Sequence, residues 1–321
     1  MAILEKEVAQ KEKIIQGNGH SLPLIETSSD KTERFGLGWL PDHPDFRDFS
    51  LEHAEIKELF KGTRLDVHGK ATASTETIPA SVDLRPWCSP IENQGALGSC
   101  TANAGVGLLE YYERRAFNNH IDGSRLFLYK TTRDLMQVSG DTGAYLRTTM
   151  ASMVLFGVPP EKYWPYNIAG FNVAQGTANF DVEPPAFCYS FASNFKTLKY
   201  FRLDPPGTAL NTLLSNIKTC VAAGFPCMFG FSVFQSFYQA QATGKIPIPA
   251  TSGDPFVGGH AVDCVGYDDS KGALLIRNSW GNWGPLGGYL WMPYDYILKG
   301  LAGDFWALTS ASYIATGNFN L

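Results

Sequence analysis

The chain has few of the features that mark membrane, secreted or nucleic-acid-binding proteins. No apolar run is long enough to cross a membrane, and the N-terminus is charged where a secretory signal would be apolar. Lys and Arg number 26 against 31 Asp and Glu, and the sequence contains no Asn-x-Ser/Thr sequon and no basic cluster. We therefore expect no nucleic-acid partner, no membrane partner and a cytoplasmic protein, with non-Sec export left open.

The sequence also lacks a metal-binding pattern. Its cysteines are irregularly spaced, with no C-x-x-C pair and no histidine at zinc-ligand spacing. We expect no metal and no organic cofactor. A chain of 321 residues can bury a large core without disulfides, so we expect the thiols to be mostly reduced. The cysteines are Cys88, Cys100, Cys188, Cys220, Cys227 and Cys264.

Two regions are predicted, a leader over residues 1–77 and a body over 78–321. The leader begins with a short amphipathic helix at 3–16. Its stretch 35–49 is rich in Pro, Asp and aromatic residues, which favours extended backbone lying on the body. Ser50 is expected to cap a helix that runs through Phe60 and closes at Gly62. The Thr-, Ser- and Ala-rich stretch 63–76 reads as a linker open to proteolysis.

The body changes its periodicity half-way along. Helical spacing predicts helices at 100–115, 146–156 and 209–223, the first with an apolar face and a charged surround. Period-two runs predict strands at 227–234, 260–267, 273–279, 288–292 and 305–309. Helices followed by strands indicate an α+β body of two lobes, one helical and one a largely antiparallel, barrel-like sheet. A site is expected in the cleft between them.

Cys100 follows a Gly-Ser turn at the start of a predicted helix. The unpaired N–H groups and the dipole of a helix N-terminus stabilise a thiolate, so the position favours a lowered thiol pKa and a nucleophile. A buried structural cysteine is the alternative, and the local pattern does not decide between them.

A nucleophilic cysteine needs a histidine base, and only two of the six histidines lie in the body. His120 follows a helix end, where a cation complements the dipole. His260 stands after two glycines at the start of a predicted strand, which is a rigid mount with room for a substrate backbone, so His260 is favoured. Asn278, at a later strand end, can orient the imidazole, and Gln94 can add its side-chain amide to the Cys100 N–H as an oxyanion hole.

Three motifs now occur together: Gln-x-x-x-Gly-Ser-Cys at 94–100, Gly-His-Ala-Val at 259–262 and Asn-Ser-Trp-Gly at 278–281. In this order and separation they resemble the papain-like cysteine peptidases. The resemblance extends through most of the body, with landmarks at 78–85, 164–166 and 287–289. It implies the papain-like two-lobed fold, with Cys100 as nucleophile, His260 as general base and acid, Asn278 as orienter, Gln94 as oxyanion donor and Trp280 as a shield of the Asn–His bond.

The resemblance also implies how a peptide or protein substrate binds. Ala144 and Tyr145 match the segment that pairs with a substrate backbone as an added strand. The loop that begins with Asn-Ser-Trp-Gly is one residue shorter than the family pattern, which leaves the fit of Trp283 and of the leaving-group side of the cleft open. The main specificity pocket is expected to be roomy rather than charged, and to favour an apolar or aromatic residue two before the cut. Its lining is predicted to include Leu146, Gly230, Gly258 and Gly259.

The sequence therefore predicts a cysteine endopeptidase made as an autoinhibited zymogen, with its own leader as a partner that covers the cleft. Leu97 and Thr101 depart from the family pattern of Cys and Trp, which indicates a site without the neighbouring disulfide. Two alternatives remain: a transpeptidase or ligase that uses the same thioester, and a non-catalytic peptide-binding module.

Overall fold

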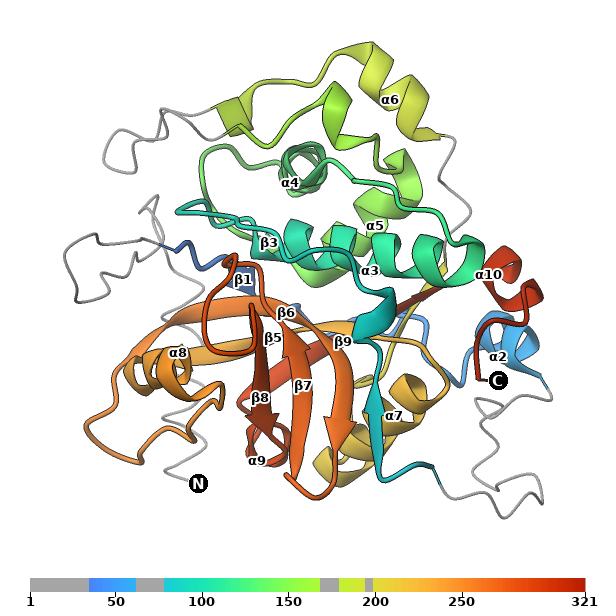
Figure 1. Ribbon diagram of the computed structural model, residues 1–321. Coiled ribbons are helices and arrows are strands. Elements are labelled where there is room, and N and C mark those ends of the chain that lie inside the picture. Colours follow the sequence, from blue (N-terminus) through green and yellow to red (C-terminus); the bar gives the residue numbers. More distant parts are fainter. Residues whose placement is uncertain (1–34, 62–77, 168–178, 194–198, 321) are drawn as a thin grey trace.

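The computed structural model describes residues 35–61, 78–167, 179–193 and 199–320 (Figure 1). The predicted helix at 3–16, the linker at 63–76 and Gly62 lie outside these ranges. No helix within them is both long and apolar enough to cross a membrane. All six cysteine thiols are free and buried, in agreement with the expectation of reduced cysteines.

The helical lobe is built on α3 (Cys100–Phe117), α4 (Arg125–Leu135), α5 (Leu146–Phe156) and α6 (Ala186–Ala192). Figure 1 shows α3 crossing the molecule between the other helices of this lobe and the sheet. Two glycines allow this close packing, because a Cβ on Gly105 would lie 3.0 Å from the Met153 sulfur, and one on Gly107 would lie 2.3 Å from the guanidinium of Arg277. Helix α3 thereby holds the two lobes together.

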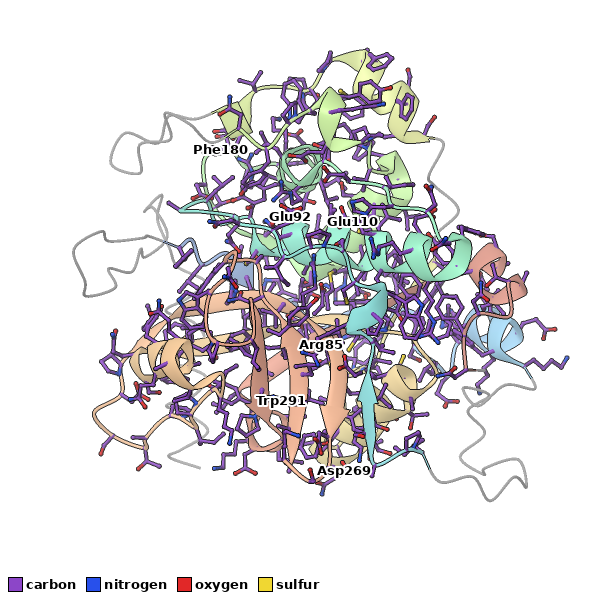
Figure 2. The ribbon with its side chains drawn as sticks, in the orientation of Figure 1. Arg85, Glu92, Glu110, Phe180, Asp269 and Trp291 are labelled. Atoms are coloured by element: carbon purple, nitrogen blue, oxygen red, sulfur yellow. The ribbon has the colours of Figure 1, made fainter. Side chains whose placement is uncertain are left out.

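The charged surround predicted for α3 is only partly solvent-exposed, since Glu110 and Arg115 are 1% and 5% exposed, whereas Glu113 and Arg114 are half-buried. Figure 2 shows Glu110 on this helix, inside the molecule. Its carboxylate accepts a hydrogen bond from the Gly123 N–H, while Arg115 donates to the hydroxyl of Tyr111. A helix covered on two sides buries its polar residues by pairing them, so its sequence pattern does not show which face is buried.

The second lobe is an antiparallel sheet whose hydrogen-bonded path runs β4–β9–β5–β6–β7–β8, with β2 paired to β6. The strands are β2 (Ser81–Asp83), β4 (Lys199–Arg202), β5 (Cys227–Phe234), β6 (Phe256–Asp268), β7 (Ala273–Arg277), β8 (Tyr289–Pro293) and β9 (Ala302–Thr309). Helix α7 (Leu210–Ala222) packs against β5 and β6. Three short helices follow it along the chain, α8 (Ala240–Thr243), α9 (Asp295–Leu298) and α10 (Ala311–Ala315). Short 3₁₀ turns span Arg85–Trp87, Glu161–Tyr163, Asn179–Asp181 and Gln235–Gln239. The fold is the expected α+β arrangement of two lobes.

Three predicted strand starts differ from the structure: β8 begins at Tyr289 rather than 288, β9 begins at Ala302 rather than 305, and the strand that carries His260 differs most. Strand β6 begins at Phe256, so His260 lies inside the strand rather than at its first residue. The ladder extends backwards because Gly258 and Gly259 pair with Val233 and Ser232 of β5. His260 is therefore held by strand pairing on both sides along the chain.

The described part of the leader lies on the body between the lobes. Strand β1 (Trp39–Leu40) pairs in parallel with β3 (Ala144–Tyr145), the residues just before α5. Helix α2 (Ala54–Phe60) buries Ile56 and Phe60 fully. Ser50 does not cap α2, because its hydroxyl accepts from the Glu52 N–H and His53 stands at the N-cap.

The apolar residues of the leader are buried to different extents. Phe35 and Leu37 belong to the main hydrophobic core, and Trp39 and Phe49 pack against it. Phe46, by contrast, is 90% exposed, so not every aromatic residue of the stretch 35–49 packs on the body. The leader is thus buried at both ends of its described stretch, since Ile56 and Phe60 belong to the same core, and it is exposed at Phe46 between them.

Candidate active site

Cys100 is the first residue of α3, as its sequence context predicts, and it is fully buried. Burial raises the pKa of the thiol to about 12. Backbone hydrogen bonds from Ala261, Gly38 and Thr101 act in the opposite direction but do not outweigh it. The lowered pKa expected from the helix N-terminus is therefore not found with the leader in place, because loss of water around the sulfur has the larger effect.

The backbone of Ala261 hydrogen-bonds to the Cys100 sulfur, so strand β6 brings its neighbour His260 into the same part of the site. Nε2 of His260 lies 2.8 Å from Oδ1 of Asn278, which directly follows β7. Its Nδ1 is buried and has no hydrogen-bond partner among the described residues. Burial lowers the pKa of the imidazole to about 4. The pair is thus held as a neutral thiol and a neutral imidazole.

Gln94 is oriented by the residue after Asn278. The Ser279 hydroxyl donates to Oε1 of Gln94 at 2.6 Å, and the Gln94 N–H donates to the Ser279 carbonyl at 2.9 Å. Because Oε1 is thereby occupied, Nε2 faces the other way and donates to the carbonyls of Leu97 and Gly36 at 2.9 and 3.0 Å. A side-chain donor is therefore fixed in direction close to Cys100, and a leader carbonyl occupies it.

Trp280 covers the histidine. Its ring centroid lies 4.8 Å from that of His260, and its indole is 2% exposed. Trp283 packs edge-on against it at 5.2 Å, while the Phe35 ring of the leader stacks on Trp280 at 4.7 Å with an interplanar angle of 10°. Water is kept away from the imidazole by aromatic rings of both the body and the leader.

The leader backbone crosses the site in extended form. The Gly36 N–H donates to the Gly95 carbonyl, and the Ala144 N–H donates to the Gly38 carbonyl at 2.8 Å. A Cβ on Gly36 would lie 2.3 Å from the Leu97 carbonyl, and one on Gly38 would lie 1.8 Å from the Gly98 carbonyl oxygen. Only glycine fits at these two positions, so the leader sequence is matched to the walls of the site.

The predicted pocket residues are only partly brought together. Gly230 and Gly259 face the indole of Trp39, because a Cβ on either would lie 2.0 or 2.4 Å from Trp39 atoms. Tyr145 is paired with Leu40, and Leu146 is fully buried as the first residue of α5. Gly258 precedes Gly259 in β6, and successive residues of a strand face opposite sides, so Gly258 does not share the Trp39 side.

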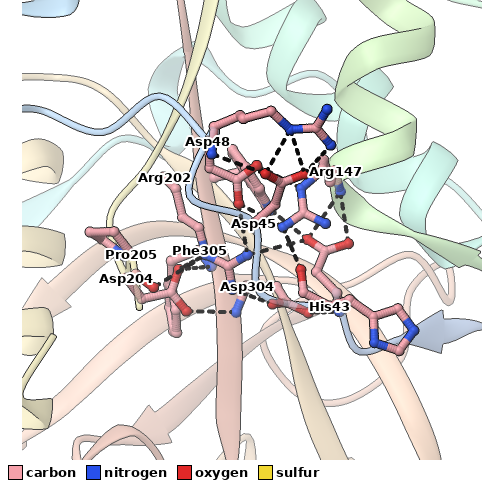
Figure 3. Close-up of polar contacts among 12 residues, drawn as sticks. His43, Asp45, Asp48, Arg147, Arg202, Asp204, Pro205, Asp304 and Phe305 are labelled. Carbon is pink, nitrogen blue, oxygen red and sulfur yellow. Dashed lines mark hydrogen bonds and ion pairs between the residues drawn. The ribbon is translucent and has the colours of Figure 1, made fainter. Parts of the chain in front are cut away.

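A cluster of ionised side chains beside this pocket was not predicted from the sequence. Figure 3 shows the leader's Asp48 facing Arg147 and Arg202 of the body, with Asp204 and Asp304 next to them. Arg147 donates two hydrogen bonds of 2.6 Å to Asp48. Arg202 pairs with Asp304 at 2.5 Å and with Asp204 at 2.9 Å. In the sequence, the aspartates of 41–48 indicate only an extended, irregular backbone, and a pair of arginines far along the chain gives no local signal of contact.

Asp42 is the most deeply buried acid of this cluster, with a fully buried side chain. It accepts from the indole N–H of Trp306 at 2.9 Å and from the backbone N–H of Arg147. Burial, followed by the nearby charge of Asp304, raises the pKa of Asp42 to about 7. The leader is therefore attached at this end by charges and by a carboxyl that binds its proton unusually tightly.

Comparison with known proteins agrees with this arrangement. The sequence model of the papain family of cysteine proteases matches residues 78–301. The chain belongs to the papain family of cysteine proteases. It is a cysteine peptidase, a hydrolase of peptide bonds, and its substrates are peptides or proteins.

The relatives include uncharacterised, bacterial and animal proteins. An uncharacterised peptidase C1-like protein of Acanthamoeba polyphaga mimivirus is 34% identical over 296 residues, which are 88% of this chain and 90% of the relative. The structure of xylellain, a cysteine protease from Xylella fastidiosa, shares 34% identity with a TM-score of 0.71, covering 88% of this chain and 99% of that one. Digestive procathepsin L 3 of Tenebrio molitor shares the fold at 20% identity and a TM-score of 0.54, covering 74% and 71% of the two chains.

Proposed function

We propose that this chain is the autoinhibited zymogen of a cysteine endopeptidase that works through Cys100, His260 and Asn278. His260 takes the thiol proton on its unpaired Nδ1, and the thiolate attacks the substrate carbonyl carbon. The oxyanion is stabilised by Nε2 of Gln94 and the N–H of Cys100. His260 then protonates the leaving amine as the C–N bond breaks, which leaves a thioester.

The second half of the reaction reverses these roles. His260 removes a proton from water as the water attacks the thioester carbonyl, and it returns that proton to the sulfur as the C–S bond breaks. Asn278 holds the imidazole through Nε2 in both halves, since the two atoms lie 2.8 Å apart. The Trp280 ring over the imidazole keeps this hydrogen bond out of water.

The observation that carries the zymogen proposal is that the leader occupies the substrate's hydrogen-bonding groups. Nε2 of Gln94 donates to the Gly36 carbonyl, and the Ala144 N–H donates to the Gly38 carbonyl. These are the donors proposed for the oxyanion and for the substrate backbone. A substrate cannot use either group until the leader leaves.

The direction of the leader should protect it from cleavage within the site. Phe35 stacks on Trp280, on the leaving-group side, whereas Trp39 lies against Gly230 and Gly259, on the acyl side. A productive substrate has its acyl part N-terminal to the cut and its leaving group C-terminal to it. The leader runs the opposite way, so its peptide bonds are presented with their ends reversed. We propose that activation requires cleavage between residues 63 and 80.

The test is whether the chain shortens itself. Purified full-length protein and a Cys100→Ala variant are incubated at several pH values between about 5 and 8, and their masses are followed. We expect the active chain to lose its leader and then hydrolyse peptide substrates, while the variant stays intact. Equal shortening of both proteins, or of neither, would contradict self-processing.

A competing amine in the same assay separates hydrolysis from acyl transfer. We expect the products to carry free carboxylates, because water is the acceptor in the proposed reaction. Products coupled to the added amine would instead assign the chain to the transpeptidase or ligase class that shares the thioester.

A further inference from the structure

The indole of Trp39 lies in the predicted specificity pocket, and the N–H at its edge donates a hydrogen bond to a carboxylate. Its ring packs over Gly230 and Gly259, and its Nε1–H donates to Oδ2 of Asp304 at 3.1 Å. The leader thus fills this pocket with a flat apolar side chain that carries one N–H donor at its edge. An intramolecular occupant of this shape is a direct indication of what the pocket accepts.

Contacts from the body fix the backbone turn at Asp304 and the Oδ1 atom of its carboxylate. Its φ of 58° lies in the left-handed region, which L side chains adopt at a cost and which concentrates at functional positions. The carboxylate of Asp204 fixes this turn by accepting from the backbone N–H groups of Asp304 at 2.8 Å and Phe305 at 3.0 Å. Arg202 binds Oδ1 of Asp304 (Figure 3). These contacts do not depend on the leader.

Among the residues that the structure describes, the printed donors to the other oxygen of Asp304 both come from the leader. Oδ2 accepts from Nε1 of Trp39 and from the backbone N–H of Asp42 at 2.7 Å. When the leader leaves, both donors leave with it, while the Arg202 bond to Oδ1 remains. Oδ2 of Asp304 then faces the pocket without the two hydrogen bonds that the leader supplied. A substrate side chain with an N–H donor can replace them.

The pocket extends beyond Trp39. A cavity of about 270 Å³ remains with the leader in place, and its lining includes Trp39, Arg202, Asp204, Gly303 and Asp304. Two carboxylates and one guanidinium on the body side give this wall a formal charge of −1 when all three are ionised. The far wall is therefore charged, which corrects the expectation of an uncharged pocket drawn from its glycines alone.

We propose that Asp304 determines specificity, by selecting a long side chain that ends in an N–H donor, arginine or tryptophan rather than leucine or phenylalanine, two residues before the cut. Gly230 and Gly259 give room for the apolar part of such a side chain, and Oδ2 of Asp304 receives its donor. Arginine suits the acidic wall as well as the cavity, because its stem is apolar and its head is a cation. This inference rests on the proposed peptidase function.

The test compares substrates that differ at one position. Full-length protein is allowed to remove its leader, and kcat/KM is measured for peptides with Arg, Trp, Phe or Leu two residues before a fixed scissile bond. We expect Arg and Trp to exceed Leu, and Asp304→Asn to reduce the Arg/Leu ratio by about tenfold to a hundredfold, as for loss of a hydrogen bond to a charged group. Asn also tolerates the left-handed conformation, so the turn is preserved.

The controls separate the two proposals. Asp269→Asn removes an exposed acid at the far end of the sheet (Figure 2) and should leave the Arg/Leu ratio unchanged. Wild-type activity that favours Leu over Arg, or a ratio that Asp304→Asn does not change, would overturn the Asp304 inference while the peptidase stands. Absence of Cys100-dependent cleavage of all four peptides would overturn the proposed function itself.

A second measurement needs no processing and works even if Asp304→Asn fails to fold. In the full chain, Trp39 is replaced by Arg, Phe or Leu, and the rate at which a thiol-directed electrophile modifies Cys100 is measured. We expect Arg to keep the leader in the cleft, and Phe and Leu to raise the rate by about tenfold, because only Arg supplies a donor to Oδ2. Equal protection by Phe and Arg would contradict a donor requirement in this pocket.

Discussion

The two ends of the docked leader bind the body by different physics. Residues 35–40 use backbone hydrogen bonds, two close glycines and aromatic contacts, and they lie over Cys100 and Gln94. Residues 42–48 use carboxylates against Arg147 and Arg202, beside the site rather than over it. In the proposed zymogen, the first part blocks the chemistry through shape, and the second attaches the leader through charge. Changes of size should therefore act on the first part, and changes of charge or pH on the second.

The largest effect is expected from Gly38→Ala in the full chain. The added Cβ would lie 1.8 Å from the Gly98 carbonyl oxygen, and its three nearest atoms all belong to the Gly98 backbone, which cannot move aside as a flexible side chain would. We expect about a hundredfold faster modification of Cys100 by a thiol electrophile, since overpacking against rigid backbone costs on the order of 3 kcal/mol. Gly140→Ala is the control, because its Cβ would meet nothing within 4 Å even though its φ is +82°.

Replacing Arg147, the body residue that pairs with Asp48 of the leader, should have the next largest effect. Arg147 makes two hydrogen bonds of 2.6 Å to Asp48, whose side chain is only 6% exposed. We expect Arg147→Met to speed Cys100 modification by about tenfold, because Asp48 then keeps only the longer pairing with Arg202.

A double-mutant cycle with Asp48→Asn checks that the effect of Arg147 comes through this pair. If both substitutions act through this pair, Cys100 should be modified in the double variant little faster than in Arg147→Met alone. Strictly additive effects would show that Arg147 supports the leader in another way.

Docking of the leader should weaken as pH rises. Burial raises the pKa of Asp42 from 3.8 to about 7 in the docked state, so docking takes up a proton between these values. The stabilisation is complete below the undocked pKa and is lost as pH rises through the docked one. Burial also raises the pKa of Asp204 to about 6 and that of Asp304, in the same direction.

Hydrogen exchange at Ala144 measures this dependence, because its N–H is protected by the Gly38 carbonyl. In the Cys100→Ala chain, after correction for intrinsic rates, we expect protection to fall between about pH 5 and 7.5, by at most about tenfold per pH unit for one proton. Asp42→Asn should flatten the curve. Protection that falls on acidification would contradict the sign of this linkage.

The smallest effect is expected at Phe35. Replacing it by Leu removes the stacking on Trp280 but keeps an apolar contact. An aromatic pair contributes about 0.5–1.5 kcal/mol beyond its buried area, so Cys100 modification should speed up by roughly twofold to tenfold. Phe46→Leu is a matched control on the same segment, because Phe46 is 90% exposed and should have no effect. An equal change at both positions would rule out a specific role for the stack.

The elements that the sequence predicts best are those with a strong period and clear ends. The helix at 146–156 and the strand at 227–234 are found at the predicted residues. Helix α4 was missed, although Ser124 caps it by accepting from the Phe127 N–H at 3.2 Å. Its buried Arg125 and Arg133 disturb the apolar face on which the prediction relies.

The candidate site was predictable where chemistry is local and not where it depends on the leader. The contexts of Cys100, His260 and Asn278 are short motifs, and each shows its chemical type in the sequence. The raised pKa of the Cys100 thiol arises from burial by a segment about sixty residues earlier, which the helix-start argument did not include. Asp304 was missed for the same reason, because its partners Trp39 and Arg202 are brought to it only by the fold.

The central claim is that the docked leader keeps Cys100 unreactive. The most direct test is the rate at which one thiol-directed electrophile modifies Cys100, identified by peptide mapping, before and after cleavage of the leader. The account predicts negligible modification of the intact chain, in which this thiol is fully buried, and rapid, selective modification after the leader dissociates. Equal rates in the two forms would contradict it.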